Sequence, residues 1–450
     1  MLRGVVAITL LGLPIIQAPA LADPPAITVR ERVRHQHIDG FGISQAFRRN
    51  ELVKALGEGR RREILDLWFD RDKGAGLSIL RLGIGSAPVG SPYDQMVSIQ
   101  PEDPGGPDAP PKYVWDGEDN SQVWVAKAAK GYGVERFYAD AWSAPAYMKD
   151  NGDDKNGGTL KPEWRQAYAR YLVQYAKFYA REGIRITDLG FTNEPDWTAT
   201  YASMRFTPQQ AAEFVKVLGP VAKGVKGLKV ACCDSFGWTE AKAYTAAIEA
   251  DPEARRWVKT HTGHTYASPV DGPLPTGGNT WMSEWNPNGS TWDESWDDGS
   301  GYDGFTIAQA VHDALTLGNV SGYVYWLGAS RGATRALLQI DEAAGTYHVS
   351  KRLWALAAYS RFIRPGAVRV DAAAADPALK VSAFRNPDGS QVVEVLNTGT
   401  AAVTWHGVYG RATAYVTDNA NALTASPVAG GAVVLQPRAL TTVVIPGRHG

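Results

Sequence analysis

Two stretches, Asp188-Leu-Gly-Phe-Thr-Asn-Glu-Pro195 and Thr280-Trp-Met-Ser-Glu-Trp285, decide how this sequence of 450 residues is expected to fold. Each is a short apolar run that ends in a glutamate, Glu194 in the first and Glu284 in the second. Short apolar runs bounded by polar residues are typical of buried strands. If both runs are parallel strands of one closed barrel, their carboxyl groups emerge at the same face of that barrel.

The rest of the chain contains six more runs of this kind, most of them followed by a helical pattern. The predicted strands are 38–44, 77–85, 136–142, 188–194, 229–234, 260–266, 280–285 and 321–327. The clearest helical patterns cover residues 51–69, 164–181, 208–223, 242–250 and 306–317. Strands that alternate with helices pair in parallel, so eight such units predict an α/β fold, a (β/α)8 TIM barrel.

The pattern changes after a helix predicted at 350–362. Short alternating runs of Val, Ala and Thr follow, broken by turn sequences such as Asn386-Pro-Asp-Gly389, which is an all-β pattern. Residues 26–37 also show a strand pattern and precede the barrel, so we expect them to join the carboxyl-terminal sheet. The expected domains are a catalytic barrel at 38–362 and a β-sandwich side domain made of 26–37 plus 363–447.

Residues 1–22 have the pattern of a signal peptide for export. Arg3 is followed by an apolar segment and by Ala20-Leu-Ala22, a small-x-small cleavage site. No later segment approaches the ~18 consecutive apolar residues of a membrane span. We therefore expect a secreted, extracellular protein that is not embedded in a membrane.

Charge and cysteine content exclude several classes of function. The 46 basic and 47 acidic residues leave a net charge of -1, so no overall field favours nucleic acid or a membrane as a partner. Cys232 and Cys233 are adjacent and cannot join distant elements; free buried thiols are favoured over a bridge between neighbours. His261 and His264, three apart on one predicted strand, would point to opposite faces and not share an ion. No cofactor or metal is expected, and a monomer is the default.

Two carboxyl groups in one cleft suit the cleavage of glycosidic bonds. One group must be a protonated acid beside the leaving oxygen, and the other an ionised nucleophile or base. Glu194 and Glu284 are the candidates for these roles. A reaction that retains the configuration of the sugar requires the two carboxyl groups to lie about 5 to 5.5 Å apart.

Several segments together resemble glycoside hydrolase family 30, whose members are retaining enzymes with a barrel fold. The matching segments are Ile38-Asp-Gly-Phe-Gly-Ile-Ser-Gln-Ala-Phe47, Leu80-Arg-Leu-Gly-Ile-Gly-Ser86, Ala139-Asp-Ala-Trp-Ser-Ala-Pro145, Gly190-Phe-Thr-Asn-Glu-Pro195, Ala231-Cys-Cys-Asp234 and Ser321-Gly-Tyr-Val-Tyr-Trp326. Ser44-Gln-Ala-Phe47, Tyr113-Val-Trp-Asp-Gly117 and Asn151-Gly-Asp-Asp154 are similar to the branch of fungal-type xylanases and glucuronoxylanases. The resemblance covers nearly the whole chain after residue 22.

The resemblance implies a role for each glutamate. Glu194, between Asn193 and Pro195, matches the acid/base, and Glu284 matches the nucleophile that forms a glycosyl ester. The sequence Trp285-Asn-Pro departs from the residues that the family usually has after its nucleophile, which bears on the details of the subsites. Asn193 is expected to bind the sugar hydroxyl next to the reacting carbon, or alternatively to cap the following turn.

Other strand residues are candidates to support the pair. Arg81 is expected to hold Glu284 ionised through a charge-assisted bond, or else to neutralise buried acid elsewhere. Tyr266 is expected to orient the nucleophile or to pack in the core. An indole face matches the apolar face of a pyranose ring. Three of the 15 tryptophans are candidate sugar platforms at strand ends: Trp142, Trp285 and Trp326.

An arginine after the first barrel strand recognises the uronic acid branch in family members that act on glucuronoxylan, and Arg49 occupies the matching position. A guanidinium fork suits a carboxylate, although Arg48 lies next to it and either residue is alternatively a solvated charge. The predicted function is a secreted retaining endo-β-1,4-xylanase or glucuronoxylanase. The alternatives are an endo-β-1,6-galactanase or β-1,6-glucanase of the same family, and a carbohydrate-binding barrel without catalysis.

Overall fold

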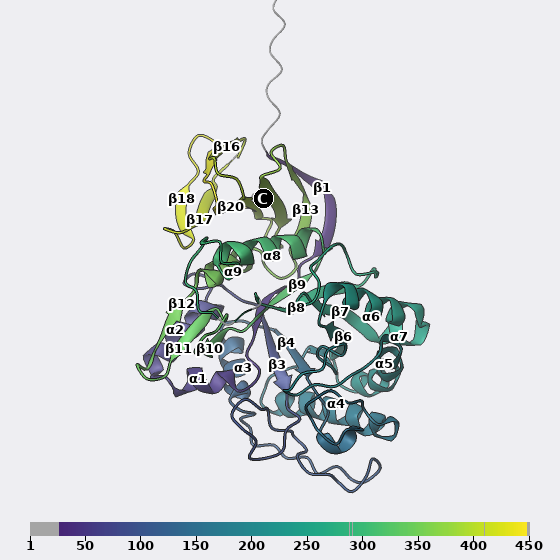
Figure 1. The fold of residues 1–450 in the computed structure, drawn as a ribbon. Coiled ribbons are helices and arrows are strands. Elements are labelled where there is room, and N and C mark those ends of the chain that lie inside the picture. The colour runs from purple at the N-terminus through teal and green to yellow at the C-terminus, as the bar shows by residue number, and fades with distance from the viewer. Residues whose placement is uncertain (1–26, 288, 290, 409, 448–450) are drawn as a thin grey trace, which may run out of the picture.

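The computed structural model describes residues 27–287, 289, 291–408 and 410–447, so the predicted signal peptide lies outside the described residues. Its centre is a closed barrel of eight parallel strands in chain order (Figure 1). The strands are β2 (Gly40–Ser44), β3 (Ile79–Ile84), β4 (Arg136–Ala141), β5 (Asp188–Leu189), β6 (Lys229–Ser235), β7 (Val258–His264), β8 (Asn279–Trp285) and β9 (Gly322–Trp326). The predicted TIM barrel is therefore confirmed.

Helices surround the barrel, as the alternating pattern predicts. They are α1 (Arg49–Ala55), α2 (Glu58–Phe69), α3 (Gln122–Gly131), α4 (Arg165–Arg181), α5 (Pro208–Lys223), α6 (Trp238–Ala250), α7 (Pro252–Trp257), α8 (Gly304–Thr316) and α9 (Lys351–Phe362), with short 3₁₀ turns η1 (Ala146–Met148) and η2 (Pro162–Trp164). The single helix predicted at 51–69 is wrong. The chain is extended at Leu56 and Gly57 and begins a new helix there, because glycine is a poor helix former.

The interior of the barrel is a packed core. Five side chains from five strands form a layer inside it: Ile79, Tyr138, Ala231, Trp281 and Val324. The Trp281 indole lies edge-on to Tyr138 and donates its N–H to Asp39 at 2.9 Å. Gly322 faces this indole so closely that a Cβ atom there would lie 2.8 Å from it. The filled interior leaves the carboxyl ends of the strands as the place for a ligand.

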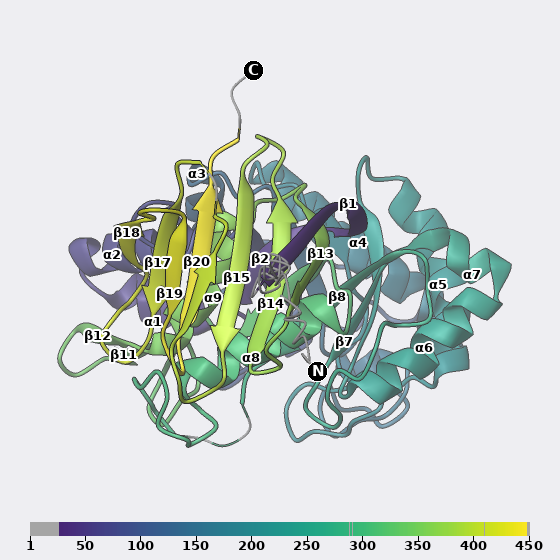
Figure 2. The same ribbon diagram turned by 90° about the horizontal axis from the view of Figure 1, so that it is seen from above.

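A side domain of antiparallel strands lies on one side of the barrel (Figure 2). Its seven-stranded sheet runs β1 (Ile27–His37), β13 (Val368–Ala374), β14 (Leu379–Arg385), β15 (Gln391–Asn397), β20 (Leu440–Ile445), β17 (Thr413–Thr417) and β18 (Thr424–Pro427). In the same domain β16 (Val403–His406) pairs with β19 (Ala432–Leu435). Outside it, β10 (Ala329–Arg331), β11 (Leu338–Asp341) and β12 (Thr346–Val349) form a small sheet next to α1 (Figure 1). The strand at the amino-terminal end pairs with β13, with Ile27 opposite Ala374.

Strand β15 contacts both cores of the molecule because its side chains alternate between two faces. Val392 and Leu396 belong to the core shared with the barrel, whereas Val393 and Val395 belong to the core of the side domain. Helix α9 packs against β15 and β20 and fills the space between barrel and sheet. The fully buried Glu394 shares the face of β15 that is directed at the barrel.

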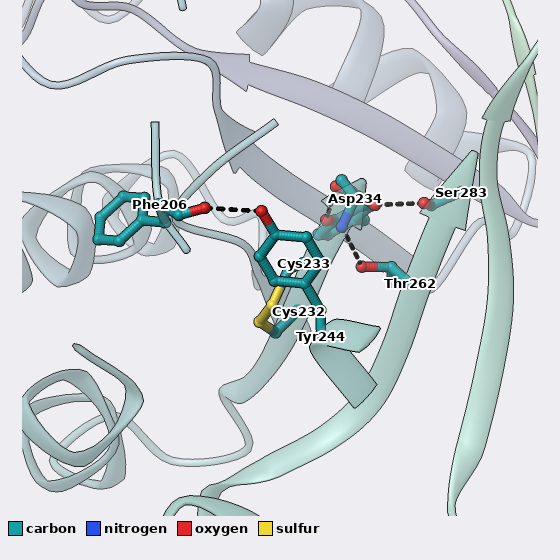
Figure 3. The surroundings of a disulfide bond; sticks show 8 residues. Phe206, Cys232, Cys233, Asp234, Tyr244, Thr262 and Ser283 are labelled. Carbon is teal, nitrogen blue, oxygen red and sulfur yellow. Dashed lines mark hydrogen bonds between the residues drawn. A yellow bond between two sulfur atoms is a disulfide. The ribbon is translucent and has the colours of Figure 1, made fainter. Parts of the chain in front are cut away.

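The expectation that the two cysteines are free buried thiols is wrong. Cys232 and Cys233 form a disulfide bond on β6, joined by a cis peptide with Cα atoms 3.0 Å apart, and are not free thiols (Figure 3). The expectation assumed a regular strand, in which adjacent side chains point to opposite faces. Within the described ranges, the structure contains no helix whose length and apolar character would suit it to cross a membrane.

Candidate active site

A cleft of about 490 Å³ opens at the carboxyl ends of the barrel strands. The residues that line the cleft, in chain order, are Phe47, Arg49, Asp94, Trp142, Glu194, Tyr201, Phe236, Tyr266, Glu284, Asn286, Trp326 and Arg335. The two predicted glutamates come from the fourth and seventh strands of the ring and are brought together in this cleft.

Glu194 lies in a segment that leaves the barrel wall early. β5 ends at Leu189 and not at residue 194 as predicted, because the backbone turns away from strand pairing. Glu194 adopts a left-handed φ of 49°, and its N–H donates to the carbonyl of Asp234 at 2.7 Å. This turn directs the carboxyl group inward, where Oε1 lies 3.1 Å from His264 Nδ1 and Oε2 accepts from the Tyr201 hydroxyl at 3.1 Å.

Glu284 lies on β8 and has two donors. The Tyr266 hydroxyl donates to its Oε1 at 3.0 Å, and the Arg81 guanidinium donates to its Oε2. Arginine cannot accept a hydrogen bond, so this pairing suits a carboxylate at Glu284. The structure thus places Arg81 and Tyr266 where the sequence predicts them, in contact with the candidate nucleophile.

The two carboxyl groups are close to each other. Oxygen atoms of Glu194 and Glu284 lie within 4.8 Å, and a ring nitrogen of His264 lies within the same distance of both. Three such groups could hold a metal ion, but only if the imidazole is neutral. Burial lowers the pKa of His264, yet Glu284, Asp234 and Glu194 outweigh it and raise this pKa to about 9. The raised pKa favours the protonated ring, whose positive charge lies beside both carboxyl groups.

Arg81 lies at the centre of a fully buried network beneath the cleft. Its Nη2 atom donates to Asp140 at 2.8 Å, to Asn193 Oδ1 at 2.7 Å and to Asp234 at 3.2 Å. The Asn193 side chain therefore bonds Arg81 and not the turn that follows it. The Arg81 guanidinium also lies 4.6 Å from the centre of the Trp142 ring. Arg81 thus contacts the candidate nucleophile and two buried acids as well, so its position fits both of the alternatives considered for it.

Two of the buried carboxyl groups are pushed toward the protonated form. Burial raises the pKa of Glu194, and Glu284 adds to this rise, although the hydrogen bond from His264 opposes it. Burial and the adjacent Asp234 raise the pKa of Asp140 well above its usual range. Glu194 is therefore suited to donate a proton at the pH where an ordinary glutamate is already ionised.

Asp234 shows the opposite behaviour. Burial alone would raise its pKa, but Arg81 and the protonated His264 hold it below the usual range. Hydroxyl groups of Tyr138 and Ser283 also donate to Asp234 (Figure 3 shows Ser283). Two cationic groups thus lie among these carboxyl groups, the Arg81 guanidinium and His264, whose pKa is raised to about 9.

Two of the three tryptophans predicted as sugar platforms lie in the cleft, and the third does not. Trp142 and Trp326 line the cleft, with ring centres 5.7 Å apart, and Phe47 lies edge-on to both. Trp285 does not line the cleft and packs, partly buried, against the core. Trp281 and Ser283 of the same strand already face the interior, and the pairing of β8 with β9 is irregular between Met282 and Trp285, so simple alternation does not hold at this end of the strand. The structure thus does not bring Trp285 into the cleft with the other two tryptophans.

The two arginines after β2 take different directions. Arg49 lines the cleft and donates to Asp94 at 2.7 Å, whereas Arg48 pairs with Glu51 outside it. Of the two, Arg49 is thus the one placed to meet a ligand. Arg335, which follows β10, also lines the cleft and was not predicted, because it lies in an irregular segment with no pattern to mark it.

Sequence reasoning also missed the acids and the histidine around the pair. Asp140, Asp234 and His264 each lie near the end of a barrel strand and point inward. His261 contacts Glu249 on the outer side of β7, so the expectation that the two histidines face opposite sides is confirmed. Because His261 faces outward, the alternation of side chains along β7 places His264 inward. This alternation was the sequence signal that could have identified His264 as a residue of the site.

Family models match both parts of the chain. The model described as O-glycosyl hydrolase family 30 matches residues 25–251, and that of the glycosyl hydrolase family 30 beta sandwich domain matches residues 366–443. The chain belongs to glycoside hydrolase family 30. It is an O-glycosyl hydrolase with a barrel and a β-sandwich domain, as the sequence predicts.

Similar members of family 30 include enzymes named for different substrates. The solved catalytic domain of xylanase C from Talaromyces cellulolyticus is 37% identical, with a TM-score of 0.86 over 93% of this chain and 99% of that chain. A glucuronoxylanase from Bacillus subtilis is 28% identical over 63% of this chain, and the match spans 64% of the relative's length. A putative glucosylceramidase 2 from Caenorhabditis elegans is 25% identical over 83% of this chain and 77% of that protein.

Proposed function

We propose that this protein is a secreted retaining endo-β-1,4-xylanase that acts on glucuronoxylan. The observation that carries the proposal is the pair Glu194 and Glu284, with oxygens within 4.8 Å in environments of opposite character. That separation is too short for a water molecule to attack between them and suits a covalent intermediate. Likeness to a xylanase and a glucuronoxylanase supports xylan as the polymer.

The reaction proceeds in two displacements. Glu194 donates its proton to the glycosidic oxygen while a Glu284 oxygen bonds to the sugar carbon, so the bond between that carbon and the leaving oxygen breaks. Glu194, now ionised, takes a proton from a water molecule. The resulting hydroxide bonds to the same carbon, the ester to Glu284 breaks, and both glutamates return to their starting states.

The proposal is tested by the release of reducing ends from a panel of glucuronoxylan, unbranched xylan, β-1,6-galactan and β-1,6-glucan. Release from xylans is expected, with the β configuration retained in the first product seen by NMR. Release from a β-1,6-linked polymer alone would assign a different substrate, and no release from any of the four polymers would contradict the proposed activity. An α product would contradict the double displacement.

Replacement of the glutamates tests their roles directly. Glu194→Gln removes the proton donor and is expected to lower kcat/KM on xylan by roughly 10² to 10⁴. Glu284→Gln removes the nucleophile and is expected to abolish turnover. Circular dichroism spectra equal to the wild-type spectrum would show that the variants are folded. A variant with the wild-type rate would contradict the role assigned to that residue.

A further inference from the structure

Three aromatic rings form a row that leads outward from Glu284. The first ring, Tyr266, donates its hydroxyl to that carboxyl group. Phe236 stacks on Tyr266 with ring centres 5.5 Å apart, and Trp197 stacks on Phe236 at 4.8 Å. Tyr266 and Phe236 line the cleft, and Trp197 lies just beyond its lining, so the row continues the cleft at one end.

The row lies on the side of the cleft to which the acid belongs. Trp197 follows Glu194 by three residues, and its N–H donates to the Glu194 carbonyl at 2.9 Å. Phe236 and Tyr266 follow the fifth and sixth strands of the ring, whereas Arg49 and Trp326 come from the first and eighth strands on the opposite side. The general acid, Glu194, must lie beside the leaving-group oxygen. The leaving-group side of the substrate therefore extends over the fourth to sixth strands.

Trp197 is exposed although its segment is firmly held. Its relative exposure is 46%, which is high for the largest apolar side chain. The backbone around it is bonded on several sides: Arg205 donates to the carbonyl of Asp196 at 2.6 Å, and Asn156 donates to that of Ala199 at 2.9 Å. A ring in a fixed position, with one face covered by Phe236, offers its other face to a ligand without a cost of ordering.

We propose that the outer face of Trp197 binds a sugar unit of the departing part of the polysaccharide. The C–H groups on a pyranose face carry slight positive charge and match the negative face of an indole. The sugar bound there would lie on the leaving-group side of the bond that is cleaved. Only a polymeric substrate supplies a sugar at this position, so only a polymer would gain this binding energy. This inference deepens the proposed function and rests on it.

The test compares a polymer with a substrate that has no sugar on the leaving side. Trp197→Ala is expected to lower kcat/KM on glucuronoxylan about tenfold. The same variant should cleave β-xylobiosyl fluoride, whose leaving group is a single atom, within twofold of the wild-type kcat/KM. Trp197→Phe keeps a flat ring and should recover most of the rate on the polymer. Val434→Ala, an exposed residue on β19, serves as the control for a surface truncation.

Two results would overturn the platform. An unchanged kcat/KM of Trp197→Ala on the polymer would show that no sugar binds the ring. An equal loss on both substrates would mean that Trp197 acts on the reacting centre or on folding. A wild-type enzyme that releases nothing from either substrate would instead remove the proposed function, and the platform with it.

Discussion

His264 is the residue that limits how far Glu194 departs from an ordinary acid. Burial raises the pKa of Glu194, whereas the hydrogen bond and charge of the protonated His264 lower it. Loss of activity at alkaline pH should follow the ionisation of Glu194, since the ionised group cannot donate a proton. We therefore expect His264 to influence the alkaline limit of the activity, since its raised pKa of about 9 favours its charged form at lower pH.

Replacing this histidine should widen the pH range at its alkaline end. In His264→Gln the positive charge is lost, so the pKa of Glu194 rises and the acid stays protonated to higher pH. The alkaline limb of kcat/KM against pH is expected to move upward, with a lower maximal rate because Asp234 also loses a partner. His261→Gln, on the outer side of the same strand, should leave the limb in place. A downward shift in His264→Gln would refute this assignment.

Arg49 offers a test of whether this protein recognises a uronic acid branch, as proposed. Its present partner, Asp94, has a side chain that is 63% exposed, and such an ion pair contributes little stability and yields easily to a ligand carboxylate. Arg49→Ala is expected to lower kcat/KM on glucuronoxylan about tenfold relative to unbranched xylan. Arg48→Ala is the matched control and should leave the ratio of the two rates unchanged. The opposite pattern would assign the branch to Arg48.

The residues that could be predicted are those that close an apolar run. Glu194 and Glu284 stand at the ends of such runs, and Arg81 needed only the alternation of one strand. Asp140 and Asp234 were missed because their importance depends on several strands meeting inside the barrel, which no single run records. Trp285 was misplaced because the irregular pairing between Met282 and Trp285 decides which side chains at this strand end face the cleft, and the sequence pattern does not reveal that irregularity.

At the level of elements, the strands were predicted well and their ends less well. Eight apolar runs identify eight barrel strands, because parallel strands buried on both faces need such runs. β5 ends five residues before the predicted limit, at Leu189, since the left-handed turn at Glu194 is set by the hydrogen bond to Asp234 and not by local preference. The cysteine bridge likewise depends on local backbone geometry that the pattern of residues does not reveal.

Helix α5 provides a prediction at this level. Thr207 caps its first turn, accepting from the N–H of Gln210, whose side chain in turn accepts from the N–H of Thr207. Thr207→Ala removes one half of this capping box and should lower the free energy of unfolding by about 1 kcal/mol. Urea denaturation measures the loss, and Thr207→Ser should restore it. A fully stable alanine variant would show that the cap contributes nothing.

For the whole molecule, Glu394 links stability to pH at the junction between the barrel and the side domain. Burial raises its pKa well above the usual range, and the Thr442 hydroxyl donates a hydrogen bond to it at 2.7 Å. In the unfolded chain a glutamate ionises near pH 4.3, so unfolding releases a proton above that pH. The free energy of unfolding should then fall by about 1.36 kcal/mol per pH unit until the folded-state pKa is reached.

Glu394→Gln removes this dependence. The stability of the variant relative to wild type should increase from pH 4 to pH 8, as measured by urea denaturation at several pH values. Glu102→Gln, at an exposed position, is the control and should follow wild type throughout. A constant difference between Glu394→Gln and wild type at all pH values would show that the buried group does not titrate as inferred.

The pairing of β1 with β13 has a consequence for the order of assembly. Arg30 pairs with Asp371, 341 positions further along the chain, so β1 cannot complete its pairing until the whole barrel has been synthesised. Contacts between such distant residues form late, because closing a long loop is entropically costly. The sheet of the side domain is therefore completed only after the barrel between β1 and β13 has been made. Removal of either end of the chain would leave an unpaired strand edge that other molecules could join.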